Sequence, residues 1–431
     1  MADLPKGYTI KTKNFKTVVV DHKLGEGGQG AVYRVSYEGE AKALKWYSGK
    51  KFKEPKRFYE NLVNNIEKGK PTSAFLWPED VTQHKGEAFG YIMGLRPGEY
   101  KDFTRFLIGK EGFASTTAMV NSSLHIVAGF RALHQKGYSY QDLNDGNFFI
   151  NPKNGDVLIC DNDNVSEYGK KSGIIGKPRY MAPEIVAKGK APDMKTDAYS
   201  LAVVLFLLWV ASHPLEGKAA CPPCMDAKNE KRIYGESPVF VWDPNDNSNR
   251  PVQGIHRGAI IRWPLLPEYL RETFVKAFSK EALTDPMQRV IEQDWLRLFI
   301  RMRSEIYKCS GSDAKPCSEV YFADPVNPNP CFACQKKNEF PFYIKTYRYN
   351  LPVHQRTKLY TCHTEKDSDN FEELAGEVSA KGNEFELKNA SDKNWTLTDD
   401  GKTTSVAPNE AFALKKGMSI GFGSSASAEV I

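Results

Sequence analysis

Residues 140–147 read YQDLNDGN, and this stretch decides how the rest of the chain is interpreted. It sets Asp142 and Asn147 five positions apart, and Asp161 follows further along the chain. The carboxylate of Asp142 can accept a proton from a substrate hydroxyl, while Asn147 and Asp161 offer the oxygen ligands that Mg²⁺ prefers. This order of residues therefore predicts metal-assisted phosphoryl transfer.

A glycine-rich segment, residues 24–33, lies upstream between two extended segments. Glycine lets backbone N–H groups approach a phosphate closely, and the strand that follows disfavours a dinucleotide-binding fold, in which a helix would follow. The next extended segment, 40–47, places the ammonium group of Lys45 where the α- and β-phosphates would lie. The nucleotide-binding residues predicted from these segments are Leu24, Gly25, Gly27, Gly30, Val32, Ala43 and Lys45.

These motifs resemble those of the eukaryotic-type protein kinases and follow that family's order from about residue 15 to about residue 305. The resemblance implies ATP and Mg²⁺ as cofactors and a protein substrate, modified on serine or threonine rather than tyrosine. It implies that Asp142, Lys45, Asn147 and Asp161 are catalytic, with Asn147 and Asp161 holding Mg²⁺. A pseudokinase scaffold that binds nucleotide without efficient transfer and a kinase of small molecules remain alternatives.

The resemblance also assigns residues around this site. Glu60 is the best candidate by spacing for the glutamate that pairs with Lys45, and Glu54 and Glu67 are alternatives. The hinge between the two lobes, with the gatekeeper residue first, is assigned to Met93, Gly94 and Leu95. Further along, the resemblance implies a structural ion pair between Glu184 and Arg289 and a buried aspartate, Asp197, at the start of an apolar helix.

Four departures from the family pattern affect these expectations. Gln141 stands where the family carries the arginine that meets a phosphorylated activation segment, so we expect no requirement for a phosphate at Ser172. Asn144 replaces a lysine beside the γ-phosphate, and Lys177 occupies a common threonine position. In residues 161–163, DND replaces DFG, which keeps the metal carboxylate but loses the aromatic residue and the glycine.

Length and composition fit a two-lobed kinase domain, residues 1–308 with lobes 1–93 and 99–308, followed by smaller modules. The chain has 431 residues, 41% hydrophobic and 26% charged, as in an ordinary globular protein. Its net charge of +6 is small for this length and argues against nucleic acid as the main partner. The beginning of the sequence lacks an apolar leader, and the longest apolar run, 201–211, is too short to cross a bilayer. We therefore expect a cytoplasmic protein with no membrane partner.

The cysteine distribution predicts structural Zn²⁺. Seven of the eight cysteines follow residue 220, and two pairs have the spacing of zinc knuckles. Region 309–368 resembles a zinc ribbon, whose four ligands we expect among Cys331, Cys334, His354, Cys362 and His363, with only one of the last two used. A second site would be formed by Cys221, Cys224, Cys309 and Cys317. Buried free thiols are the alternative for this second set, and a nucleic-acid module built on the ribbon is an alternative function.

The remaining segment, 369–431, contains short alternating strands separated by turns, which predicts a small β-sandwich. It resembles the forkhead-associated type, although residues that would recognise phosphothreonine are not evident, so we expect a docking role. The predicted fold class is thus α+β, a kinase fold followed by a small zinc-binding β region and a sandwich. This order resembles bacterial stress-signalling kinases encoded with a von Willebrand-type protein and a PP2C-type phosphatase, which implies those two proteins as partners.

Overall fold

The computed structural model describes residues 3–28, 30–48, 54–84, 88–167, 169, 176–221, 225–311, 316–325, 329–382 and 384–431. The chain divides into two compact units, residues 1–293 and 294–431. The first unit ends before residue 308, where the sequence placed the end of the kinase domain.

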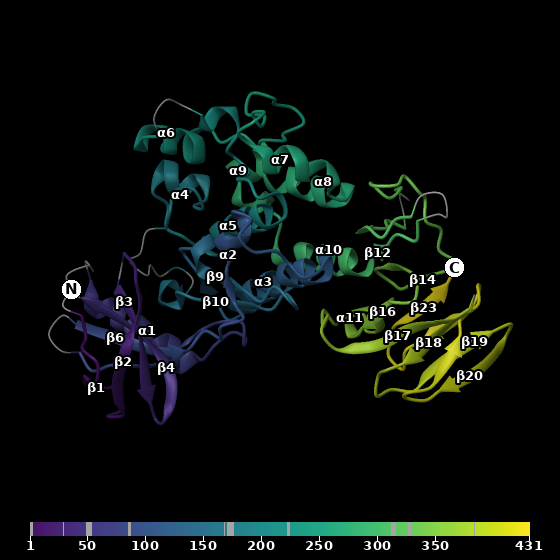
Figure 1. Ribbon diagram of the computed structural model, residues 1–431, viewed down its shortest axis with the longest axis horizontal. Coiled ribbons are helices and arrows are strands. Elements are labelled where there is room, and N and C mark those ends of the chain that lie inside the picture. The colour runs from purple at the N-terminus through teal and green to yellow at the C-terminus, as the bar shows by residue number, and fades with distance from the viewer. Residues whose placement is uncertain are drawn as a thin grey trace. The chain divides into compact units, whose positions relative to one another are not determined.

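The first unit begins with an antiparallel six-stranded sheet of order β1-β2-β3-β4-β6-β5 (Figure 1). Its strands are β1 (Thr9–Lys11), β2 (Thr17–Glu26), β3 (Gly30–Tyr37), β4 (Glu40–Ser48), β5 (Pro78–Val81) and β6 (Ala88–Gly94). Helix α1 (Pro55–Lys68) buries Phe58 and Leu62 in one cluster with Tyr47 and Phe89 of the sheet. The buried residues of this helix recur every three to four positions, as expected for a helix that buries one face.

Helices dominate the rest of the first unit (Figure 1). They are α2 (Phe103–Leu107), α3 (Thr116–Gln135), α4 (Pro183–Lys188), α5 (Met194–Val210), α6 (Ala227–Lys231), α7 (Arg257–Arg262), α8 (Glu268–Ala277) and α9 (Lys280–Thr284). Short strands accompany them: β7 (Lys101–Asp102), β8 (Tyr138–Ser139), β9 (Phe148–Ile150), β10 (Val157–Ile159) and β11 (Ser166–Glu167).

Helix α5 forms the centre of this larger lobe. Asp193 caps its first turn by accepting hydrogen bonds from the backbone of Lys195 and Thr196, and residues 196–210 are all buried. A helix that is apolar on every side must lie inside a protein or a membrane. Among the described residues, the helices are all too short or too polar to cross a membrane.

The segment 212–262, which the sequence suggested was an exposed loop, is partly a packed structure. Phe240 and Val241 are buried, and the side-chain amide of Asn249 donates to the backbone oxygens of Leu215 and Val239. These hydrogen bonds satisfy buried carbonyl groups that a polar loop would otherwise leave unpaired. Composition alone did not reveal this, since Asn is also a common turn residue.

The second unit opens with α10 (Glu292–Ser304, with only its first two residues in the first unit) and a hairpin of β12 (Ile306–Lys308) and β13 (Val320–Phe322). Two sheets follow, of order β15-β14-β23-β22-β19-β20 and β16-β17-β18-β21. Their elements are β14 (Tyr343–Lys345), β15 (Asn350–Pro352), β16 (Lys358–Tyr360), α11 (Thr361–Thr364), β17 (Leu374–Lys381), β18 (Glu384–Asn389), β19 (Trp395–Asp399), β20 (Lys402–Val406), β21 (Ala411–Ala413), β22 (Ser419–Gly421) and β23 (Ser427–Val430).

The two sheets pack face to face and form the predicted β-sandwich. At Gly376 of one sheet, a Cβ atom would lie 2.9 Å from the ring of Trp395 in the other, so only glycine fits there. The predicted division at residue 368 differs from this arrangement. Strand β14 pairs with β23, and β16 pairs with β17, so strands on both sides of residue 368 share the same sheets.

Candidate functional site

Residues 140–147, which we call the catalytic segment, are positioned by the buried carboxylate of Asp197. This carboxylate accepts hydrogen bonds from the backbone N–H groups of Tyr140 (2.6 Å) and Gln141 (3.3 Å) and contacts Nε2 of His134 at 3.1 Å. Burial opposes a charge on His134, but the hydrogen bonds with Asp197 and Glu292 outweigh it and raise the pKa of His134 to about 9. The resemblance to protein kinases placed Asp197 correctly at the start of α5. The role of Asp197 is to fix the backbone before Asp142.

Asp142 lies in a polar, largely buried setting. Its carboxylate accepts hydrogen bonds from the side-chain amides of Asn144 (3.3 Å) and Asn164 (3.4 Å). Burial raises the pKa of Asp142 to about 6, and the Lys177 ammonium opposes the shift. A carboxyl group with a pKa near the working pH can accept a proton in a reaction and release it afterwards.

Asn147 and Asp161 occupy neighbouring elements. Asn147 is buried in a short 3₁₀ turn, 145–147, and its amide nitrogen donates to the hydroxyl of Tyr140 at 3.0 Å. Since the nitrogen is engaged, the amide oxygen is the remaining group for a metal ion. Asp161 adopts a left-handed backbone conformation (φ 54°), which Asp tolerates better than most residues. An amide oxygen and a carboxylate at this place fit Mg²⁺ with its nucleotide.

Lys45 is held by two carboxylates from one segment. Its Nζ lies 3.1 Å from Oδ1 of Asp161 and 3.0 and 2.9 Å from the two oxygens of Asp163. Asp163 is fully buried and also accepts a hydrogen bond from the Tyr47 hydroxyl. Burial opposes the charge of Lys45, but Asp163 and Asp161 outweigh it and hold the pKa of Lys45 above its usual value.

The predicted partnership of Lys45 with Glu60 is therefore corrected. Helix α1 turns Phe58 and Leu62 inward, and Glu60, two positions from each, faces solvent. The alternatives are engaged elsewhere, since Glu54 contacts Arg57 and Glu67 contacts Lys13. The signal that could have revealed the true partner was present in the sequence, because Asp163 adds a second carboxylate to the segment that carries Asp161.

The predicted nucleotide-binding residues of the smaller lobe lie on β2, β3, β4 and β6 and in the connections beside them. Gly25 is exposed near the end of β2 and Gly27 is exposed in the loop that follows, while at Gly30 a Cβ atom would lie 2.4 Å from the backbone oxygen of Trp46, which explains the glycine. The apolar side chains that would contact adenine share one cluster, formed by Val32, Ala43, Met93 and Leu95. Gly94 lies opposite Lys42 in the β4–β6 pair, and Leu24 is half exposed beside the loop.

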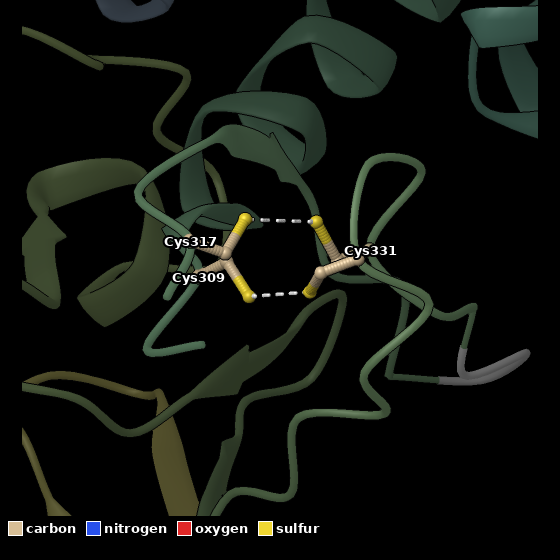
Figure 2. A group of neighbouring side chains, drawn as sticks. Cys309, Cys317 and Cys331 are labelled. Atoms are coloured by element: carbon tan, nitrogen blue, oxygen red, sulfur yellow. Dashed lines mark hydrogen bonds between the residues drawn. The ribbon is translucent and has the colours of Figure 1, made fainter. Parts of the chain in front are cut away.

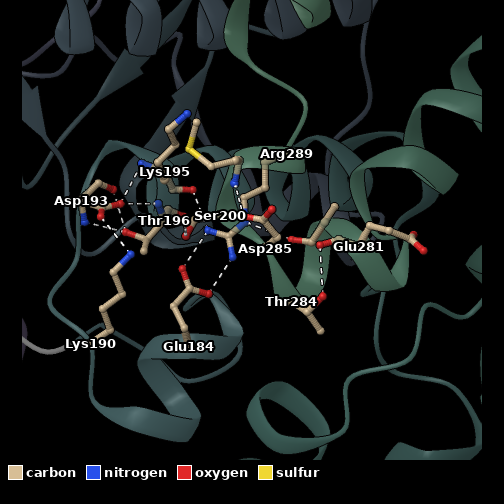
Figure 3. Close-up of polar contacts among 12 residues, drawn as sticks. Glu184, Lys190, Asp193, Lys195, Thr196, Ser200, Glu281, Thr284, Asp285 and Arg289 are labelled. Atoms are coloured by element: carbon tan, nitrogen blue, oxygen red, sulfur yellow. Dashed lines mark hydrogen bonds and ion pairs between the residues drawn. The ribbon is translucent and has the colours of Figure 1, made fainter.

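The structural ion pair predicted for Glu184 is confirmed. Arg289 donates from its two terminal nitrogens to the two carboxylate oxygens of Glu184, at 3.0 and 2.6 Å (Figure 3). Arg289 also donates to the backbone oxygen of Lys195, at the start of α5. This bidentate pair ties α4, which follows the activation segment, to the helical core.

The activation segment carries a lysine close to the catalytic segment. Nζ of Lys177 lies 2.9 Å from Oδ1 of Asn144 and 4.0 Å from Oδ1 of Asp145. Ser172 lies outside the described residues, so the independence of activity from a phosphate there stays a prediction. Gln141, which replaces the phosphate-binding arginine, donates its side-chain amide to the hydroxyls of Ser139 and Ser166 instead.

Four cysteines of the second unit form a cluster (Figure 2). We call Cys309, Cys317, Cys331 and Cys334 the cysteine cluster, since their sulfur atoms all lie within 4.8 Å of one another. The sulfur atoms of Cys309 and Cys334 lie 3.6 Å apart, and those of Cys317 and Cys331 lie 3.8 Å apart. The backbone N–H of Gly311 donates to the sulfur of Cys309, as does Asn338. Four thiols in this arrangement match a tetrahedral Zn²⁺ site.

The cluster corrects the two ligand sets predicted from the sequence, since it takes two cysteines from each. His354 packs against Tyr307 and Phe340, while Nδ1 of His363 accepts a hydrogen bond from the backbone of Tyr360. The remaining predicted ligands outside the cluster are Cys221, Cys362 and Cys224, the last of which lies outside the described residues. Cys362 and His363 lie on the helical turn α11, and neither belongs to the cysteine cluster.

Comparisons with known proteins agree with this site. The model of the protein kinase domain matches residues 18–251, more than half of the chain. G protein-coupled receptor kinase 2 of Caenorhabditis elegans is 25% identical over 199 residues, which cover 44% of this chain and 28% of that protein. Beta-adrenergic receptor kinase 1 of Homo sapiens is 26% identical over 193 residues, 43% of this chain and 27% of that protein. The chain spans less than a third of the length of these relatives. On the extent of the domain match and the order of the residues at the site, the chain belongs to the protein kinase family.

Proposed function

We propose that this protein transfers the γ-phosphate of ATP to serine or threonine side chains of a protein substrate. The observation that carries the proposal is the convergence of Lys45, Asp142, Asn147 and Asp161 at one site, which leaves few parts of the phosphoryl-transfer machinery missing. The preference for serine or threonine rests on the resemblance of the motifs.

Each residue has a chemical role in this proposal. Asp142 accepts the proton of the substrate hydroxyl as the new P–O bond forms and the bond to the departing ADP oxygen breaks, so the electron pair stays with ADP. Lys45, held by Asp163, positions the phosphates, and Asn147 and Asp161 would hold Mg²⁺. When bound, Mg²⁺ neutralises charge on the phosphates.

The test uses labelled ATP and purified protein with a range of substrates. Wild-type protein should transfer phosphate to itself or to a protein, phosphoamino-acid analysis should find phosphoserine or phosphothreonine, and Asp161→Ala should abolish transfer. If wild-type protein binds nucleotide yet transfers no phosphate with any metal ion or substrate, it is a scaffold. The order of modules supports a von Willebrand-type protein and a PP2C-type phosphatase in bacterial stress signalling as the first substrates and partners to try.

We also propose that the cysteine cluster binds one structural Zn²⁺. The segment around it is short and interrupted by prolines, and its apolar core is small, consisting of the cysteines with Tyr307, Tyr321, Ala323 and Phe340. A zinc ion held by four thiolates can supply folding free energy on the order of 10 kcal/mol in such small modules. Four protein ligands leave no open position, so the ion would stabilise the fold without taking part in chemistry.

A further inference from the structure

We propose that Lys177 is a catalytic residue that supplies positive charge to the transferred phosphoryl group from the activation segment. The inference rests on the proposed phosphotransfer. It concerns Asn144 and Lys177, two residues that differ from the kinase family pattern and that have no role in the reaction described above. The structure places these two residues in direct contact, although 33 positions separate them in the chain.

The contacts link Lys177 to the catalytic base. Oδ1 of Asn144 accepts hydrogen bonds from Lys177 Nζ at 2.9 Å and from the backbone N–H of Gly146 at 3.0 Å. The amide nitrogen of Asn144 donates to the backbone oxygen (3.0 Å) and to Oδ1 (3.3 Å) of Asp142. Asn144 is buried, and it links the Lys177 ammonium to the carboxylate of Asp142.

The backbone beside Lys177 also approaches Asp142. At Gly176 a Cβ atom would lie 3.2 Å from Oδ1 of Asp142 and 3.3 Å from the backbone oxygen of Gln141. The absence of a side chain at Gly176 thus lets the activation segment lie against the catalytic segment.

The distribution of charge favours Lys177 over Lys45 for this role. Lys45 is buried and contacts both Asp161 and Asp163, so two carboxylates already balance its charge. Lys177 is exposed, and its Nζ lies 4.0 Å from Oδ1 of Asp145. A transferring phosphoryl group carries negative charge on three oxygens, and a cation aimed at them stabilises the transition state. The Lys177 ammonium would donate a hydrogen bond to one of these oxygens and keep its own proton.

The decisive variant is Lys177→Met, which removes the charge and keeps most of the stem. We expect kcat to fall on the order of 10²-fold, as for the loss of one charge-stabilising donor, while the Kd for ATP stays nearly unchanged. Lys177→Arg, which retains the charge, should keep most of the activity. Lys188→Met removes an exposed lysine from the end of α4 and should leave kcat unchanged.

The pH profile supplies a second readout, which reports the charge of Lys177 beside Asp142. The charged groups that act on Asp142 are Lys177, which lowers its pKa, and Asp161, which raises it. In Lys177→Met the acid limb of kcat/KM should therefore shift to higher pH. The inference is overturned if Lys177→Met retains the wild-type kcat and acid limb, or if Lys177→Arg is no more active than Lys177→Met. A wild-type protein without any phosphotransfer would instead overturn the proposed function.

Discussion

The carboxylate of Asp163 holds Lys45 from the same segment that carries Asp161. The lysine is therefore held without a glutamate from α1, since Glu60 is exposed. Helix α1 contacts this segment by other residues, since the side-chain amides of Asn61 and Asn65 donate to the backbone oxygen of Val165. The segment 161–163 thus combines the metal-facing residue and the lysine partner in one rigid turn.

Asp163→Asn tests this arrangement against Glu60→Gln as its control. Removing one partner of a buried ion pair costs on the order of 3 kcal/mol of folding free energy, and the loosened Lys45 should lower kcat/KM. Glu60→Gln lies on the exposed face, where a substitution changes stability by about 0.5 kcal/mol or less. Chemical unfolding and phosphate-transfer rates measure both effects. Equal behaviour of the two variants, or a greater loss with Glu60→Gln, would contradict the role given to Asp163.

The raised pKa of Asp142 predicts opposite effects on activity and stability. The carboxylate must be deprotonated to accept a proton, so kcat/KM should fall as the pH drops below about 6. The folded-state pKa lies above the ordinary value of 3.8, so folding favours the protonated form and loses stability as the pH rises from about 4 to about 6. Asp142→Asn should therefore be more stable than the wild type above pH 6. Urea titrations at pH 4 and pH 7 measure the difference in unfolding free energy between this variant and the wild type. If the advantage of the variant is no larger at pH 7 than at pH 4, the result counts against the raised pKa of Asp142.

At the scale of elements, the cysteine cluster joins Cys309, directly after β12, and Cys317, shortly before β13, to the turn that contains Cys331 and Cys334. This combination of four cysteines could not be predicted from their spacing in the sequence, because the pairing of β12 with β13 is what brings Cys309 and Cys317 together. The CxxC spacing of Cys331 and Cys334 revealed half of the site. The other half depends on a tertiary contact that the local pattern does not contain.

Zinc analysis of purified full-length protein tests the cluster. We expect about one zinc ion per chain, as for a single four-thiolate site. Cys331→Ser should lower the zinc content and the melting temperature of the second unit. Cys221→Ser and His354→Gln replace residues that belonged to the two sequence-based ligand sets but not to the cluster, and both should retain zinc. Retention of zinc by Cys331→Ser, or its loss in either control, would refute this ligand set.

Secondary structure was predictable where an element has a strong period of its own. The bounds of α1 and the burial of α5 follow from apolar spacing and from an unbroken apolar run. The position of Glu60 in the sequence did not reveal the partner of Lys45. The apolar residues of a helix decide which of its faces turns inward, and Glu60 lies on the face that turns to solvent. Similarly, Lys177 and Asn144 each departed from the family pattern, but only the fold shows that they meet.

At the scale of the whole molecule, the kinase unit and the second unit are each built around their own core. The sequence indicated the sandwich through its alternating strands, but it misplaced the beginning of this domain. Short strands such as β14 and β16 bury few residues of their own and are defined by the partners that they find later in the chain. Such long-range pairing is not contained in a local pattern.

Phosphate transfer by Asp142→Asn, compared with nucleotide binding by the same variant, tests the central claim most directly. If Asp142 is the base of a protein kinase, the variant should bind ATP with Mg²⁺ as the wild type does, because Asp142 does not hold the nucleotide in this account. Its rate of phosphate transfer to protein should fall by at least about 10²-fold, the usual contribution of a positioned base. A wild-type protein that binds ATP but transfers nothing, or an Asp142→Asn variant that transfers phosphate at the wild-type rate, would contradict the account.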